Sequence, residues 1–140
     1  MNLQQIQLVQ ESFEHVKPIT DIAADIFYGR LFELDPALRP YFKGDMAEQK
    51  AKLMTTLAFA VAALKQPERL LPAVRQLGRR HAGYGVQIEH YQTVGAALLW
   101  TLGQGLGDEF TPAVEEAWTA AYTLLAATMQ EATEMAAVPA

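Results

Sequence analysis

The sequence predicts an all-α fold, and two observations support this prediction. Apolar residues recur at intervals of three and four along most of the chain, which places them on one face of a helix. Prolines and glycines interrupt this pattern and predict where helices end. The sequence has no run of alternating apolar and polar residues bounded by turn signals, so no strand is expected. We expect about six main helices with short loops, in a single domain over residues 1–140.

The composition fits a folded protein and excludes cysteine chemistry. Of the 140 residues, 51% are hydrophobic and 19% are charged, and none is cysteine. Disulfides, cysteine–metal sites, thiol catalysis and covalent cofactor attachment through cysteine are therefore excluded. The net charge of -5 argues against nucleic acid and an acidic membrane surface as partners. The N-terminus does not resemble a signal peptide, and the longest apolar stretch, residues 57–64, is too short to span a bilayer, so we expect a cytoplasmic protein.

The first half of the chain predicts two long helices and a short one. A first amphipathic helix ends before Pro18, because the residue before proline disfavours helical geometry. A second helix begins at Ile19 or Thr20 and runs to about residue 34. Its expected buried face consists of Ile22, Ile26, Phe27, Leu31 and Phe32. Asp35 and the proline after it predict a short, partly 3-10 helix that closes at residues 41–42.

The second half predicts three more long helices and one helix that carries an unusual histidine. The long segments are residues 46–65, residues 88–106 and a last helix that starts at Thr111 and Pro112. The remaining helix covers residues 68–80 and is expected to start near Leu71, which would place Pro72 at an early position. Glycines after residue 82 and near residue 105 predict the ends of two of these helices.

The apolar stripe of the 68–80 segment ends in His81. Leu70, Val74, Leu77 and His81 are separated by four, three and four residues and share one face. A neutral imidazole can bind a metal through one nitrogen while a hydrogen bond orients the other. The alternative is an ordinary hydrogen-bonded core histidine. His15 and His90 are expected at the surface.

Three residues on other segments could face this histidine across a cavity: Tyr28, Gln49 and Leu53. A single protein ligand suits heme, since the porphyrin supplies four nitrogens to the iron. Each residue also has a simpler interpretation. Tyr28 could donate to a backbone carbonyl, Gln49 could touch solvent at the edge of its stripe, and Phe42 could be ordinary core packing.

In order and spacing, the chain resembles bacterial single-domain globins, including the Vitreoscilla type and the globin domain of flavohemoglobins. The resemblance covers nearly the whole chain. It rests on Phe27-Tyr28, Leu31-Phe32, Phe42, Gln49, Leu53, Leu77-Gly78-Arg79-Arg80-His81, Tyr84-Gly85-Val86, His90-Tyr91, Val94-Gly95, Ala117-Trp118 and Ala121-Tyr122. It implies the globin fold, a three-over-three helical sandwich around a non-covalent heme b.

The resemblance also implies a role for each matching residue. His81 corresponds to the proximal iron ligand, and Tyr28 and Gln49 to the distal residues that stabilise iron-bound oxygen. The remaining heme contacts are Phe42, which stacks on the porphyrin, Leu53 over the iron, Arg80 toward a propionate, Val86 at the porphyrin edge and Tyr91 behind the histidine. Flavohemoglobins have a glutamate on the last helix where counting places Thr133, with Glu131 and Glu134 nearby, so strong activation of the histidine is not expected.

The function implied by this resemblance is reversible binding of dioxygen at a pentacoordinate heme, with nitric oxide and carbon monoxide as competing ligands. The roles that follow are oxygen binding or transport, or nitric oxide detoxification. An alternative is a nitric oxide dioxygenase that works with a separate reductase. A heme-free interaction or sensor module is a third alternative. We expect a monomer or a weak homodimer.

Overall fold

The computed structural model describes residues 1–83 and 85–137, with the side chains of residues 133–137 outside the description. Within these ranges the chain forms six α-helices and three short 3-10 helices, and no strand. The all-α prediction is therefore confirmed. In the same part of the chain, no helix combines the length and the apolar character that a membrane crossing requires.

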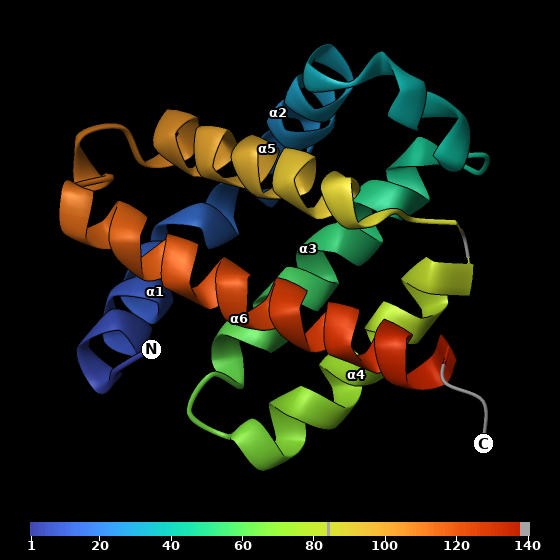
Figure 1. Cartoon of the computed structure of the whole chain (residues 1–140). Coiled ribbons are helices and arrows are strands. Elements are labelled where there is room, and N and C mark those ends of the chain that lie inside the picture. The colour runs from blue at the N-terminus through green and yellow to red at the C-terminus, as the bar shows by residue number, and fades with distance from the viewer. Residues whose placement is uncertain (84, 138–140) are drawn as a thin grey trace.

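The helices follow one another with short connections (Figure 1). Their bounds are α1 Leu3–Val16, η1 Lys17–Ile19, α2 Thr20–Leu34, η2 Pro36–Tyr41, α3 Met46–Ala62, α4 Pro67–Gly83, α5 Ile88–Leu106, η3 Gly107–Glu109 and α6 Pro112–Ala137.

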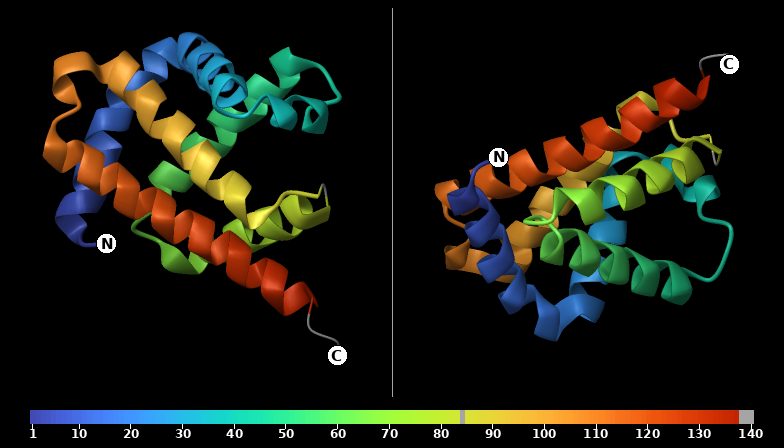
Figure 2. Two further views of the ribbon diagram at one scale, coloured as in Figure 1. Left: turned by 45° about the horizontal axis from the view of Figure 1, so that its top comes forward. Right: turned by 90° about the horizontal axis from the view of Figure 1, so that it is seen from below.

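The longest helices hold the others in place. In Figure 1, α5 and α6 run antiparallel at the front, and α1, α2 and α3 lie behind them. α4 packs mainly on α6, α2 packs mainly on α5, and α1 packs mainly on α6. α3 is held chiefly by α2 and α1. α3 and α4 follow each other in sequence (Figure 2). They nevertheless pack mainly against different helices.

Local side-chain chemistry sets several helix ends. Asn2 and Gln5 form a capping box at the start of α1. The carboxylates of Asp35 and Asp45 accept hydrogen bonds from the amides of residues 37 and 47 at the starts of η2 and α3. The hydroxyl of Thr111 accepts from the Val114 amide at 3.3 Å, which confirms the predicted start of α6.

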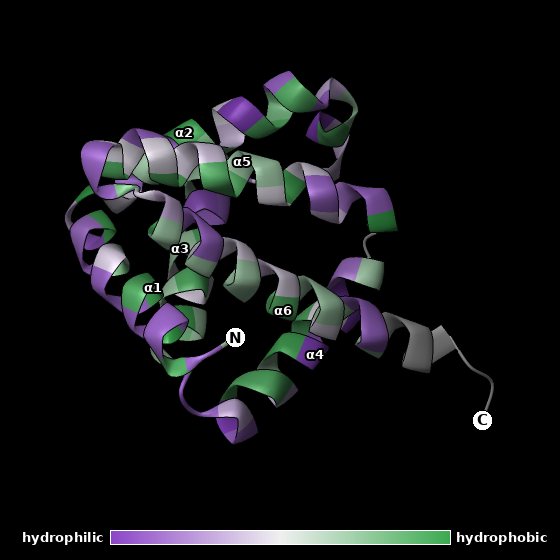
Figure 3. Ribbon diagram, turned by 60° about the vertical axis from the view of Figure 1, so that its left-hand side comes forward, coloured by the Kyte–Doolittle hydropathy of each residue, from purple (hydrophilic) through white to green (hydrophobic). Residues whose placement is uncertain are grey.

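The apolar core is divided into two clusters. The larger one joins residues of all six α-helices around fully buried side chains such as Phe13, Leu70 and Trp118. The smaller one surrounds Tyr28 on α2 and includes Phe27, Leu31, Leu38 and Ala97. Leu98 of α5 packs against both clusters. Figure 3 shows apolar residues gathered on the inward sides of the helices, with polar residues on the outer sides.

Some expectations from the sequence are corrected. α4 begins at Pro67 rather than near Leu71, because a proline is tolerated in the first turn, and Pro72 lies inside the helix. α3 ends at Ala62, three residues before the predicted end. Ile22 was expected on the buried face of α2 but is 57% exposed.

His90 was expected at the surface but is half-buried. Its Nδ1 accepts a hydrogen bond from the Gln87 amide at 2.9 Å, and its ring lies edge-on against Tyr41. This contact belongs to the start of α5 and gives His90 a capping role. His15 is exposed as expected, and its Nδ1 lies 3.5 Å from a carboxylate oxygen of Glu109.

Candidate functional site

A tyrosine and a glutamine from two helices meet inside the smaller cluster. Tyr28 of α2 is only 4% exposed. The side-chain amide of Gln49, which lies in the first turn of α3, donates to its phenol oxygen at 3.2 Å. The sequence alone left open a backbone carbonyl as the partner of Tyr28 and solvent as the partner of Gln49. The structure brings the two side chains together instead.

The Tyr28 hydroxyl keeps one hydrogen that this contact does not use. Its oxygen accepts from Gln49, so its own O–H points elsewhere, and no acceptor for that hydrogen is found among the residues the structure describes. Burial raises the pKa of Tyr28, and the Gln49 hydrogen bond partly offsets this effect. The phenol therefore remains protonated near neutral pH and is a buried hydrogen-bond donor.

Aromatic rings enclose this donor. The Tyr28 ring meets Phe27 at 5.0 Å and Phe42 at 5.4 Å between centroids, both edge-on. Phe42 also meets Phe32 at 5.5 Å, again edge-on. Such edge-to-face pairs are favourable and fix the ring orientations. Phe42, which follows η2, is thus turned back onto α2 and stays half-buried.

Several apolar side chains that pack against the two clusters are incompletely covered. Leu53 of α3 and Val94 of α5 pack against the smaller cluster and are half-buried. Leu57 of α3 and Leu77 of α4 pack against the larger cluster and are also half-buried. Apolar surface on α3, α4 and α5 is therefore only half covered, and another apolar group could cover it.

His81 lies in the last turn of α4 and is half-buried. Its Nδ1 is 2.9 Å from the carbonyl oxygen of Leu77, one turn earlier. In the tautomer that donates this bond, the unprotonated nitrogen is Nε2, which is the form a metal requires. Burial lowers the pKa of His81; the bond to Leu77 raises it in part, and the charge of Arg80 lowers it further. The geometry therefore favours a neutral, oriented imidazole.

The other predicted residues lie around the ends of α4 and α5. Tyr91 is half-buried near the start of α5, packs against the larger cluster, and has a pKa raised by burial. Val86 is half-buried in the connection between α4 and α5, and Arg80 is exposed. Tyr84 and the side chains of Thr133 and Glu134 lie outside the described residues, and Glu131 is exposed.

These features fit the heme that the resemblance implies. A flat apolar group needs apolar surface, and residues of α3, α4 and α5 leave such surface half-covered. An iron centre needs one neutral imidazole, which His81 can supply. A bound gas with partial negative charge needs a donor, which Tyr28 can supply.

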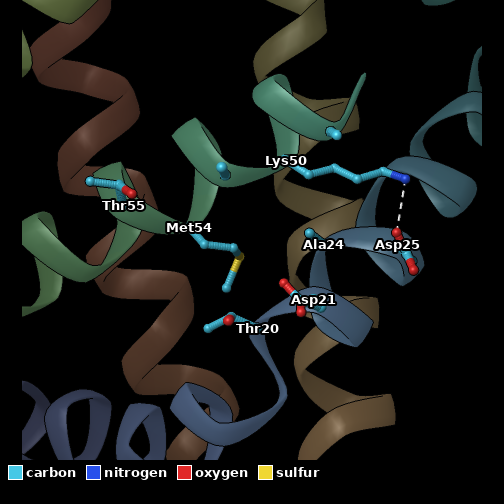
Figure 4. Close-up of a pocket in the computed structure, with 9 residues that line it drawn as sticks. Thr20, Asp21, Ala24, Asp25, Lys50, Met54 and Thr55 are labelled. Atoms are coloured by element: carbon cyan, nitrogen blue, oxygen red, sulfur yellow. Dashed lines mark ion pairs between the residues drawn. The ribbon is translucent and has the colours of Figure 1, made fainter. Parts of the chain in front are cut away.

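A pocket of about 480 Å³ elsewhere does not include any of these residues (Figure 4). It lies between α2 and α3 and is lined by Thr20, Asp21, Ala24, Asp25, Ala47, Lys50, Ala51, Met54 and Thr55. The Lys50 ammonium reaches across it to Asp25 at 2.8 Å. This ion pair ties α2 to α3 next to the Tyr28–Gln49 contact.

Two contacts near the site were not expected from the sequence. The Tyr122 hydroxyl of α6 donates to the Tyr91 carbonyl of α5 at 2.6 Å. Gly78 of α4 lies directly against the backbone of Met129 of α6. Only the close approach permitted by Gly95 was predictable, from a glycine on the apolar face of α5.

Comparisons with known proteins identify the family and the fold of the chain. The globin family model matches residues 25–129. A flavohemoprotein of Vibrio cholerae is 41% identical over 105 residues, covering 71% of this chain and 26% of that protein. A flavohemoprotein of Rhodopirellula baltica is 32% identical over 125 residues, covering 86% of this chain and 30% of that protein. The chain therefore spans less than a third of the length of these relatives.

A solved structure also resembles the whole chain. It is an engineered carbene transferase derived from a candidate nitric oxide dioxygenase of Rhodothermus marinus. It superposes with a TM-score of 0.86 and 28% sequence identity, covering 98% of this chain and 96% of that one.

Proposed function

This chain belongs to the globin family, and we propose that it binds heme b non-covalently through His81 and reversibly binds dioxygen, with nitric oxide and carbon monoxide as competitors. The observation that carries the proposal is the buried Tyr28 hydroxyl. It accepts from Gln49 and still has a hydrogen to donate. We also propose that residues 1–140 act as one globin domain, as a monomer or weak homodimer in the cytoplasm.

Each residue of the site has a separate task. When bound, heme supplies a ferrous iron that takes a diatomic gas as ligand and transfers charge to it. We propose that His81 binds the iron through Nε2, because Nδ1 lies 2.9 Å from the Leu77 carbonyl oxygen. Tyr28 meets negative charge on the gas with an O–H that accepting from Gln49 polarises. Phe42 and Leu53 exclude water, which strengthens that hydrogen bond.

The remaining predicted contacts belong to the outer part of the site. We propose that Arg80, which is exposed, pairs with a heme propionate and that Val86 covers a porphyrin edge. Tyr91 supports the histidine side of the site from α5. The half-buried leucines of α3 and α4 would contact the porphyrin when heme is bound.

A second function is favoured by the comparisons. The relatives are flavohemoproteins, and the structural neighbour derives from a candidate nitric oxide dioxygenase. The alternative is therefore that the chain oxidises nitric oxide to nitrate with dioxygen and receives electrons from a reductase. The site described above serves both functions, since each begins with bound dioxygen.

Two experiments test these proposals. The absorption spectrum of the ferrous protein, reconstituted with heme, is recorded with and without dioxygen. A reversible spectral change is expected, and a protein that takes up no heme contradicts the proposal. Steady-state consumption of nitric oxide with an added reductase then separates the two functions. Sustained turnover supports the enzyme, whereas a single stoichiometric burst supports the oxygen binder.

A further inference from the structure

One face of α6 touches both helices that carry the histidine side of the site. Tyr122 and Met129 are seven residues apart, so they lie two turns apart on nearly the same face. Tyr122 meets α5, and Met129 meets α4. Figures 1 and 2 show α6 running beside both helices, which agrees with the packing of α6 on α4 and α5.

The contact with α4 is as close as two backbones allow. A Cβ placed on Gly78 would lie 2.5 Å from the Met129 carbonyl oxygen and 2.6 Å from the Met129 Cα. Both atoms belong to the backbone of α6, so no side-chain rotation could relieve this overlap. Any side chain at position 78 must move α4 away from α6. His81 is three residues further along α4 and moves with it.

The contact with α5 is equally specific. A Cβ placed on Gly95 would lie 2.7 Å from Cε2 of the Tyr122 ring. That ring is held in place, because its hydroxyl donates to the Tyr91 carbonyl at 2.6 Å. Tyr91 is one helical turn before Gly95, so the hydroxyl and the ring of Tyr122 contact two successive turns of α5.

From these two contacts we propose that Gly78 and Gly95 are positioning residues, which let one face of α6 fix His81 and Tyr91 relative to each other. The inference rests on the proposed function, in which His81 binds the heme iron. It adds that the position of His81 depends on two glycines, Gly78 and Gly95, which do not themselves contact the ligand.

The test compares Gly78→Ala and Gly95→Ala with the matched control Gly29→Ala. Gly29 also lies inside a helix, but a Cβ there meets no atom within 4 Å. Each protein is reconstituted with ferrous iron protoporphyrin IX. Folding is checked by circular dichroism, and two quantities are measured: porphyrin affinity and the iron–histidine stretching band in resonance Raman spectra.

We expect both glycine variants to bind porphyrin about tenfold more weakly, because the overpacked helices move apart. We also expect a shifted iron–histidine band in these two variants, whereas Gly29→Ala keeps the parent band. A merely structural role would lower stability and leave the band unchanged. Folded variants of Gly78 and Gly95 that keep the parent band overturn the inference.

A compensating variant keeps the test decisive if Gly78→Ala does not fold. The atoms that a Cβ at position 95 would meet all belong to the Tyr122 ring, so Tyr122→Leu should relieve that overlap in a double variant. Partial return of the band toward the parent in Gly95→Ala/Tyr122→Leu supports the inference, and no return overturns it. If the parent protein shows no band that depends on His81, the proposed function itself fails.

Discussion

At the scale of single residues, Tyr28 and Gln49 depend on each other. The phenol oxygen of Tyr28 accepts from the Gln49 amide, so the hydroxyl hydrogen is directed away from that amide. An O–H whose oxygen already accepts a hydrogen bond is a stronger donor, because the two bonds polarise each other. The pair therefore presents one polarised donor within an aromatic surrounding rather than two separate polar groups.

Replacing Tyr28 with Phe removes this donor and keeps the ring contacts with Phe27 and Phe42. One hydrogen bond of about 1–2 kcal/mol corresponds to a roughly 5- to 30-fold faster release of dioxygen. Stopped-flow measurement of the dissociation rate checks this, with Tyr41→Phe as the control because Tyr41 is 41% exposed and outside the cluster. An unchanged rate in Tyr28→Phe would assign the stabilisation to another donor.

Replacing His81 with Ala removes the imidazole that we propose as the iron ligand. The ferrous protein is expected to lose its iron–histidine ligation and to regain a five-coordinate spectrum when free imidazole is added. Absorption spectra with and without imidazole measure this. His15→Ala is the control, since His15 is exposed and pairs with Glu109. Identical ferrous spectra for the parent and His81→Ala contradict the assignment of the ligand.

Tyr122 predicts how stability changes at alkaline pH. Burial, reinforced by Tyr91, raises the pKa of Tyr122 well above its ordinary value of 10.0. Above pH 10 the unfolded chain releases this proton while the folded chain retains it, so the free energy of unfolding falls as pH rises. Tyr122→Phe should flatten this decline in urea unfolding between about pH 9 and 11.5. A slope equal to that of the parent contradicts the prediction.

At the scale of helices, the sequence predicted most elements because their ends carry local signals. Thr111 and Pro112 start α6, and Asp35 and Pro36 start η2, since caps and prolines act within a few residues. The start of α4 was misplaced for the same reason. Two prolines, Pro67 and Pro72, both suit a first turn, so the local signal alone does not distinguish the two starts, and the helix begins at the earlier one.

Contacts between helices were less predictable, and the Ser12–Trp118 contact is an example. The Trp118 indole N–H of α6 donates to the Ser12 hydroxyl of α1 at 2.8 Å, and both side chains are buried. The two residues are 106 positions apart in sequence. No periodicity relates residues at that distance, so the pair is found only in the folded chain.

Ser12→Ala leaves the buried indole N–H without its acceptor. The expected cost is about 1–3 kcal/mol in the free energy of unfolding, because a desolvated donor is left unpaired. Urea unfolding of the heme-free protein measures it. A double variant, Ser12→Ala with Trp118→Phe, separates this cost from the loss of ring packing through a double-mutant cycle. Additive effects of the two substitutions would show that the hydrogen bond contributes nothing.

At the scale of the whole molecule, the fold could be predicted from the sequence and the organisation of the site only in part. The resemblance identified the globin fold, which the family model and the superposition confirm. It also named Tyr28, Gln49 and Phe42, which the structure brings together. The roles of these residues, and of His81, stay predictions. The contact of Gly78 with the backbone of α6 was missed, because it depends on the distance between helices and not on the pattern along one helix.

The division of the core into two clusters has a consequence for the stability of the molecule. Leu98 packs against both clusters, while leucines of α3 and α4 that pack against one cluster or the other remain half-buried. A ligand that covers this apolar surface binds the folded chain and not the unfolded one, so it must stabilise the fold. Iron protoporphyrin IX at about 1,000 times its dissociation constant should therefore add roughly 4 kcal/mol to the free energy of unfolding.

Chemical unfolding of the protein at increasing porphyrin concentrations measures this stabilisation. The midpoint should rise with the logarithm of the free porphyrin concentration, since the stabilisation is linked to binding. In His81→Ala the apolar contribution remains while the iron ligand is absent, so a smaller rise is expected at the same concentration. A midpoint that does not depend on porphyrin would mean that the half-buried surface between α3 and α4 is not a heme site.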